Sequence, residues 1–555
     1  MRRASLTSRP TLPFVGTVLA MLATFHLLDI GIARLAALPA SAYAGRVFSD
    51  NLVARWWTLL SSRVPWWLTA VAIAVVALVA IGDHWLFRGA GRQRLAPLFA
   101  SWNALEEGTS LRWLVVGVTG VAAWALSCYP RNLYFDRLHG VDRLLVVALW
   151  AAIAWRPIFV LPFSIIAAAV AGQFFVPLGF ISWTEMSVVL RFPLLLGAFW
   201  MVRAISGDKR SDAFIFAWCC VLAATYWTSG LGKLRIGWMT HPHVHLLLLG
   251  AYANGWLAFL DAQVVERVAG VVKVLARPFM IFTLAVECGA LLLLWRRWSL
   301  VAFLLLATTF HLGAFALTGI FFWKWMLVDA FLLAYLLRTQ RIGRLEIFRP
   351  ALFALSVVAI VASPLWVPSE NLTWFDTPLT YSLRFEGVDA RGTTYELPAG
   401  FFRPYSEVFV LGTVAAVSPN PQVTRGMGVT MDRSLATALE SATSPNDALA
   451  IEAARGTVRV DSAASATFDD FVGHYAARAS CAADREPLAL RIVGVPRHLW
   501  TLPLDASLPC GVRLVTVRVV EQTTFFDGRT LQVIRRRVLR EVPVPTDNSG
   551  LGTRD

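Results

Sequence analysis

The sequence Tyr226-Trp-Thr-Ser-Gly-Leu-Gly-Lys-Leu-Arg-Ile-Gly-Trp238 closes an apolar run that begins near residue 213. It places Lys233 at the end of a segment long enough to cross a bilayer, which takes roughly 20 helical residues. The chain has four lysines, at positions 209, 233, 273 and 324, so 46 of its 50 basic residues are arginine. An amine in apolar surroundings can lose its proton and act as a base, whereas a guanidinium cannot. Lys233 is therefore a candidate base, and the alternative is an interfacial lysine whose ammonium extends toward water.

The composition indicates a membrane protein. The chain has 555 residues, of which 57% are hydrophobic and 15% charged, and its mean hydropathy is +0.59. Soluble globular domains carry about 25% charged residues. Much of the formal net charge of +14 lies in short loops between apolar runs, where arginine and lysine set membrane topology. We therefore expect the lipid bilayer, and not nucleic acid, to be the partner of this charge.

Apolar runs of membrane-spanning length recur over residues 1–366 and predict an all-α polytopic domain. Residues 143–177 form one long run that Arg156-Pro157 interrupts, so they contain either two spans or a re-entrant pair. The total is then nine to eleven spans. The runs lie near residues 13–33, 65–82, 111–128, 143–155, 157–176, 185–205, 213–231, 278–295, 299–317, 319–337 and 350–366.

Five clusters of basic residues predict the orientation of these spans. With eleven spans all five clusters fall on one side, which the excess of positive charge identifies as the cytoplasmic side. The N-terminus is then cytoplasmic, and the last span exits to the outside. The clusters are Arg2, Arg3 and Arg9; Arg88, Arg92 and Arg94; Lys209 and Arg210; Arg296 and Arg297; and Arg338, Arg341, Arg344 and Arg349.

Residues 367–555 have a different pattern and predict an extracytoplasmic α+β domain. Alternating polar and apolar residues indicate strands exposed on one face, and an Asp-Gly pair between two such runs indicates a hairpin. Cys481 and Cys510 would fit a disulfide in an oxidising compartment. The predicted elements are strands at 379–385 and 512–520, a hairpin turn at 526–529, and helices near 432–455 and 466–480.

Four ionisable residues lie within the apolar runs after Lys233: Glu287, His311, Lys324 and Asp329. A charge at the bilayer centre costs at least about 2.5 kcal/mol, so each is a candidate functional residue. Glu287 and His311 lie on consecutive antiparallel runs, roughly 14 and 21 Å from the connecting turn at 1.5 Å per residue. We expect all five residues to face one outward-opening cavity, with Asp329 deepest. The alternative is a set of interhelical pairs, such as Glu287 with Lys324, that only fix helix packing.

The motif Tyr226-x3-Gly230-x-x-Lys233-Leu-x3-Trp238, followed by Glu287 and then by Phe310-His311, resembles the HTTM family. This is the membrane domain shared with vitamin K-dependent γ-carboxylase. The resemblance covers residues 190–335 and is only architectural before them.

The resemblance implies a reaction and a site. Lys233 would deprotonate reduced vitamin K or menaquinol, the quinol anion would react with O2, the resulting strong base would take the γ-proton of a glutamate, and CO2 would add. His311 would be a second catalytic residue, and the expected substrate is a peptide or protein. Tyr226, Trp238, Glu287 and Lys324 would line the quinone pocket.

Two further interpretations remain open. The carboxylase has an Asn-Asn-His-Ser-Tyr motif in an early loop, where this chain reads Arg131-Asn-Leu-Tyr-Phe-Asp-Arg-Leu-His139. This chain has no histidine beside Asn132. The second interpretation is therefore a non-catalytic receptor, immunity or assembly protein that binds a partner through its outer domain. The third interpretation is a quinone-linked oxidoreductase that does not carboxylate.

A cluster of histidines, His241-Pro-His-Val-His245, follows the lysine motif. On a helix the first and last of them would share a face, as metal ligands do. The adjoining sequence offers no carboxylate or cysteine ligand, so we expect interfacial polar residues here and no metal.

Overall fold

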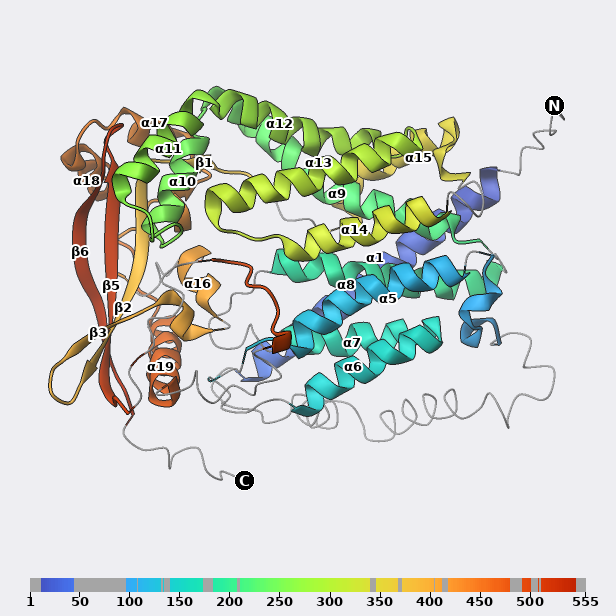
Figure 1. Cartoon of the computed structure of the whole chain (residues 1–555), viewed down its shortest axis with the longest axis horizontal. Helices are drawn as coiled ribbons and strands as arrows, with labels where there is room; N and C mark the ends of the chain where they lie inside the picture. The colour runs from blue at the N-terminus through green and yellow to red at the C-terminus, as the bar shows by residue number, and fades with distance from the viewer. Residues whose placement is uncertain are drawn as a thin grey trace.

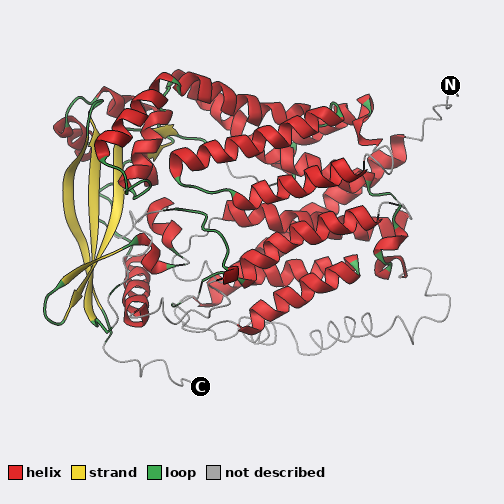
Figure 2. Ribbon diagram, viewed as in Figure 1, coloured by secondary structure: helices red, strands yellow, loops and turns green. Residues whose placement is uncertain are grey.

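The computed structural model of the chain combines a helical bundle with a small antiparallel sheet that stands across one end of the bundle (Figures 1 and 2). The expected sequence of an apolar helical part followed by an α+β part is confirmed at this level. The structure describes residues 11–43, 96–106, 108–130, 133, 140–172, 183–206, 210–339, 346–367, 372–403, 405–411, 418–479, 492–500, 508 and 511–545. The predicted span at 65–82 and the pair Cys481 and Cys510 lie outside these residues.

The helices of the bundle follow the apolar runs of the sequence. They lie side by side in Figure 1, with the long α9 near the middle. The helices are α1 (Thr11–Tyr43), α5 (Gly108–Ser127), α6 (Gly140–Trp155), α7 (Val160–Gly172), α8 (Trp183–Ser206), α9 (Asp212–Ile236), α12 (Ala276–Gly289), α13 (Arg297–Thr318), α14 (Trp323–Thr339) and α15 (Pro350–Val361).

Within the described ranges, five helices are long and apolar enough to cross a membrane: α1, α5, α8, α9 and α13. A sixth candidate joins α11 (Ala262–Val274) to α12, with a bend of 64° between them. The sequence places the start of that span near residue 278, whereas the structure includes α11 in the bent pair. The helices α6, α14 and α15 are shorter, at 16, 17 and 12 residues.

The sheet has the order β3-β2-β5-β6, with all neighbours antiparallel. Both predicted strands and the predicted hairpin are confirmed, and Gly528 adopts a φ of 95° in the turn. A second pairing, β1 with β4, is only two residues long. The strands are β1 (Phe375–Asp376), β2 (Leu379–Asp389), β3 (Thr394–Leu397), β4 (Val429–Thr430), β5 (Leu514–Phe526) and β6 (Leu531–Pro543).

Several helices pack against the sheet. Most come from the C-terminal part of the chain, residues 367–555, and α10 comes from the segment after α9. The first predicted helix, 432–455, is divided at Ser444-Pro445, where Ser444 begins a new helix with a capping box. An apolar cluster that includes Phe385, Phe402 and Phe471 packs one of these helices, α19, against the sheet. The helices are α10 (Val244–Ala253), α16 (Ser406–Leu411), α17 (Arg433–Ser441), α18 (Pro445–Ala453) and α19 (Ser462–Ala479).

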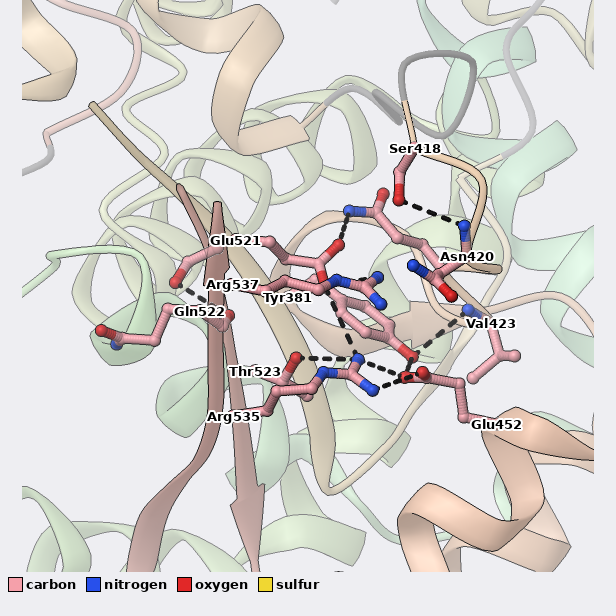
Figure 3. A network of polar contacts seen from close by, with 12 residues as sticks. Tyr381, Ser418, Asn420, Val423, Glu452, Glu521, Gln522, Thr523, Arg535 and Arg537 are labelled. Carbon is pink, nitrogen blue, oxygen red and sulfur yellow. Dashed lines mark hydrogen bonds and ion pairs between the residues drawn. The ribbon is translucent and has the colours of Figure 1, made fainter. Parts of the chain in front are cut away.

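A buried polar network fastens β2, β5, β6 and α18 together (Figure 3). Arg535 donates two hydrogen bonds of 2.7 Å to the carboxylate of Glu452, which also accepts one of 2.7 Å from Tyr381. The fully buried Glu521 accepts a 2.6 Å bond from Gln422, and Arg537 Nη2 lies 2.7 Å from its Oε1 in an ion pair without hydrogen-bond geometry. Buried charges paired in this way fix the relative positions of the elements that carry them.

Candidate functional site

The end of α9 that faces the sheet holds the lysine motif. Tyr226 and Lys233 are seven residues apart, which is about two helical turns, so both side chains leave the same side of α9. The helix ends at Ile236, and the next residue, Gly237, has a φ of 70°, the left-handed conformation typical of a helix C-terminus. The chain then turns through Trp238–Thr240 toward α10, which packs near β1.

Lys233 forms a buried ion pair with Glu287 of α12. Lys233 Nζ lies 2.6 Å from Glu287 Oε1, and the two residues are 8% and 3% exposed. The Lys233 ammonium also lies over the ring of Trp238, 5.6 Å from its centroid. The structure therefore favours an interhelical pair over an interfacial lysine that extends to water. The partner of Glu287 is Lys233 and not Lys324, which was the pairing considered from the sequence.

Gly230 makes this pairing possible. It lies three residues before Lys233, so it faces the same side of α9. A Cβ at this position would come within 2.9 Å of both Glu287 Cβ and Cys288 Sγ. A larger residue would force α9 and α12 apart at the level of the ion pair. This is the physical reason for a glycine in the middle of an apolar helix.

We expect Gly230→Ala to lower the free energy of unfolding by about 1–3 kcal/mol, the usual cost of overpacking. Unfolding followed by tryptophan fluorescence in lipid nanodiscs measures the change. Gly289→Ala on α12 is the matched control, because nothing lies within 4 Å of a Cβ there. Equal stability of the two variants would contradict the close packing of α9 on α12.

Tyr226 pairs with His311 of α13. The Tyr226 hydroxyl and His311 Nε2 lie 2.8 Å apart, and both residues are buried. The aromatic rings of Phe303, Phe322 and Trp325 surround this pair at centroid distances of 5.0–5.9 Å. The Phe-His pair of the sequence thus lies beside the tyrosine of the lysine motif.

Several polar atoms around these two pairs have no hydrogen-bond partner among the described residues. They are Glu287 Oε2, His311 Nδ1 and both carboxylate oxygens of Asp329, which is 1% exposed. Glu287 and Asp329 are both near enough to act electrostatically on the Tyr226 hydroxyl. A buried polar atom without a partner is costly. The set therefore offers unpaired carboxylate oxygens and one unpaired imidazole nitrogen to a ligand with hydroxyl groups.

Lys324 contacts an aromatic ring of its own helix. Its ammonium lies over the ring of Trp323, 5.2 Å from the centroid, and Trp323 contacts Trp124 of α5. Its neighbour Trp325 faces His311 instead. Successive residues of a helix point about 100° apart, so Lys324 and Trp325 cannot share one face. The contacts described above bring together five of the six predicted site residues and do not include Lys324.

A carboxylate that the sequence did not single out lies close to Lys233. Asp376 of β1 is 5% exposed, and its Oδ1 accepts a 3.1 Å hydrogen bond from Trp374 Nε1. Asp376 and Lys233 are near enough to interact electrostatically. No periodicity marks this residue, because it lies in a short extended segment far along the chain from α9.

A short segment of the second part of the chain lies across the loop between α13 and α14. Phe321 N donates to His498 O at 2.6 Å, and Trp500 N donates to Gly319 O at 3.0 Å. The His498 ring lies 5.4 Å from Phe322, which in turn lies 5.0 Å from His311. These backbone bonds hold Phe322 against the Tyr226–His311 pair.

The three histidines after the lysine motif contact the second part of the chain. His241 lies near Thr437, and His243 Nε2 lies 3.1 Å from Glu440 Oε2, both on α17. The part of the chain that the structure describes contains no group of three or more His, Cys, Asp or Glu side chains that could hold a metal ion. His241 and His243 thus contact α17 from the turn before α10, whereas the His245 ring lies 6.4 Å from Phe526 of β5.

Known proteins give no independent identification of this arrangement. No protein-family model, curated protein or solved structure matches the chain.

Proposed function

We propose that this chain is a membrane enzyme that activates a reduced quinone, vitamin K hydroquinone or menaquinol, with Lys233 as the base. In this proposal, which follows the resemblance to the HTTM family and to vitamin K-dependent γ-carboxylase, the enzyme carboxylates a glutamate of a peptide or protein. The single observation that carries the proposal is the buried Lys233–Glu287 pair of 2.6 Å beside the Tyr226–His311 pair of 2.8 Å.

The residues present fit a quinol. A quinol has a flat aromatic body and two hydroxyl groups at opposite ends. Trp238, Phe322 and Trp325 offer aromatic surfaces, while Glu287 Oε2 and His311 Nδ1 have no other hydrogen-bond partner among the described atoms. Together with O2, the bound quinol would supply the strong base that removes a glutamate γ-proton before CO2 adds.

The role of Glu287 is to hold the proton that Lys233 must release. The Glu287 carboxylate, 2.6 Å away, favours the ammonium form of Lys233. Burial acts in the opposite direction, because an apolar site favours two neutral groups over an ammonium and a carboxylate. Transfer of the shared proton to Glu287 leaves both groups neutral and leaves the amine able to accept a proton from the quinol. Tyr226 and His311 would orient the ring from the other side.

We propose that the bundle spans the membrane with the end that bears the sheet on the outer side. Support comes from the opposite end, where Arg210 and Arg297 of the predicted basic clusters lie. Arg210 pairs with Asp212 at the start of α9, and Arg297 at the start of α13 donates to Leu336 O near the end of α14. Basic residues gather on the cytoplasmic side of membrane proteins. The site at the end of α9 would then lie toward the outer face.

Reconstitution with a labelled co-substrate tests the proposal. The full chain in nanodiscs is incubated with a reduced quinone, O2, 13C-bicarbonate and a library of glutamate-containing peptides, and the peptides are analysed by mass spectrometry. We expect quinol-dependent addition of one labelled CO2 to a glutamate. Loss of the general base should lower the rate about 10²–10⁴-fold in Lys233→Ala.

Lys273→Ala is the matched control, because Lys273 is exposed on α11 and should retain the full rate. An unchanged rate in Lys233→Ala would remove Lys233 as the base. Quinol oxidation without any labelled peptide would favour the oxidoreductase, and the absence of both reactions with every quinone would favour a binding protein.

A further inference from the structure

The strand β1 carries a carboxylate from the sheet-bearing part of the chain to the end of α9. Residues just before and just after Asp376 in the sequence make hydrogen bonds that fix its position. Before it, Trp374 donates its indole N–H to the Asp376 carboxylate at 3.1 Å. After it, the Thr377 hydroxyl donates to Gly428 O at 2.8 Å and lies 3.2 Å from Leu379 O. The position of this carboxylate is therefore set by β2 and by the segment that leads into β4.

Asp376 lies near Lys233, because its neighbour Phe375 packs in one apolar cluster with Trp238, whose ring centroid is 5.6 Å from Lys233 Nζ. The elements packed against β1 are α10, α17 and β4, and they or their adjoining turns carry other titratable or charged groups. Among the groups that the structure describes, the electrostatic influence on Asp376 comes from Lys233. The titratable or charged groups on these elements and their adjoining turns are His241, His243, His245, Arg425, Asp432, Arg433 and Glu440.

We propose that Asp376 is a positioning residue of the Lys233 site, which sets from outside the bundle how the proton is shared between Lys233 and Glu287. An ionised Asp376 adds a second negative charge near the amine and favours the ammonium form. A protonated Asp376 removes that charge and favours transfer of the proton to Glu287. The catalytic meaning of this role rests on the proposed function of Lys233, whereas the coupling itself does not.

The protonation of Asp376 changes in the physiological range. Burial raises the pKa of Asp376 to about 7, although the hydrogen bond from Trp374 and the Lys233 ammonium both act to lower it. A carboxyl group with a raised pKa is neutral below that value and charged above it. Acidification of the outer side below pH 7 would therefore move the shared proton toward Glu287.

Infrared titration of the full chain in nanodiscs tests this coupling without any substrate. The carboxylic acid C=O band that disappears in Asp376→Asn belongs to Asp376, and we expect its midpoint near pH 7 in the wild type. Lys233→Met removes the positive charge that favours ionised Asp376, so the midpoint should rise by about 0.5–1 pH unit. Lys233→Arg keeps the charge and should leave the midpoint near the wild-type value.

Two more variants separate this coupling from a general effect of mutation. Trp374→Phe removes the hydrogen bond to Asp376 and should also raise the midpoint. Lys273→Met removes an exposed charge on α11 and should change nothing. An Asp376 midpoint that is equal in wild type and Lys233→Met would overturn the proposal, as would a midpoint near the ordinary value for an aspartate.

The second readout follows Glu287. Its own C=O band, identified with Glu287→Gln, should grow in Asp376→Asn above pH 7, because Lys233 then loses a negative neighbour. If the Asp376 midpoint moves in Lys233→Met but no quinol-dependent product forms, the coupling stands and the proposed function fails. If product forms while the midpoint does not move, the proposed function stands and the role of Asp376 fails.

Discussion

Lys233→Met and Glu287→Met should each destabilise the protein by about 3–5 kcal/mol, while the double substitution should be close to the wild type. Each single variant leaves one buried charge without its partner, in a site where both residues are less than 10% exposed. The double variant removes both charges and fills the space with two apolar side chains of similar length. Replacement of a whole buried ion pair by apolar residues is often neutral.

The free energies of unfolding of the four proteins form a double-mutant cycle, measured in nanodiscs or mixed detergent. The cycle isolates the interaction energy of the pair. Lys273→Met serves as a control for the loss of an exposed lysine, with an expected change within about 0.5 kcal/mol. Additive losses in the double variant would mean that Lys233 and Glu287 act independently, as an interfacial lysine would.

Activity separates the two roles of the pair. We expect the double variant to recover stability but not quinol-dependent activity, because no amine remains to act as the base. A structural pair would instead return both properties together. The cycle therefore distinguishes a helix-packing contact from a catalytic pair, two alternatives that the sequence leaves open.

Local patterns predicted the elements of this fold better than their contacts. The apolar run that ends at Lys233 becomes α9, and the alternating run from Leu379 becomes β2, because periodicity is a property of each segment alone. The Tyr226–His311 pair follows from a motif on one helix and a Phe-His pair on another. Such residues need only the correct face of each helix to meet.

The remainder of the site depends on tertiary packing. Asp376 comes near Lys233 only because Phe375 of β1 packs with Trp238, just after α9, and no local pattern encodes that approach. For Lys324 the sequence had no definite partner to name, since an ionisable residue in an apolar run does not reveal which neighbour it faces. The sequence alone also could not predict the packing role of Gly230, because that role depends on the distance between α12 and α9.

Arg535→Met should destabilise the sheet-bearing part of the chain by about 3–5 kcal/mol. The substitution leaves Glu452, which is 5% exposed, with only the Tyr381 hydroxyl. It also removes one of the positive charges that balance the fully buried Glu521 carboxylate, whose Oε1 lies 3.6 Å from Arg535 Nη2. Hydrogen exchange of β5 and β6 measures the loss, because the network joins these strands to β2 and α18 (Figure 3).

Arg518→Met on the same hairpin is the control. Its 2.8 Å bond to Glu541 joins two exposed side chains, and such pairs contribute about 0–1 kcal/mol. Arg535→Met combined with Glu452→Met should recover part of the loss, since the orphaned carboxylate is then gone. Equal exchange rates in the two arginine variants would show that the buried network does not hold the sheet.

The same substitution tests whether the sheet positions Asp376. Tyr381 of the network lies on β2 two residues after Leu379, whose carbonyl lies 3.2 Å from the hydroxyl of Thr377, beside Asp376. Loosening of β2 should therefore displace β1 from the end of α9. We expect the Asp376 midpoint in Arg535→Met to move upward, as in Lys233→Met, because the carboxylate then loses its positive neighbour. A destabilised sheet with an unchanged Asp376 midpoint would instead mean that α10 and α17 hold β1 in place without the network.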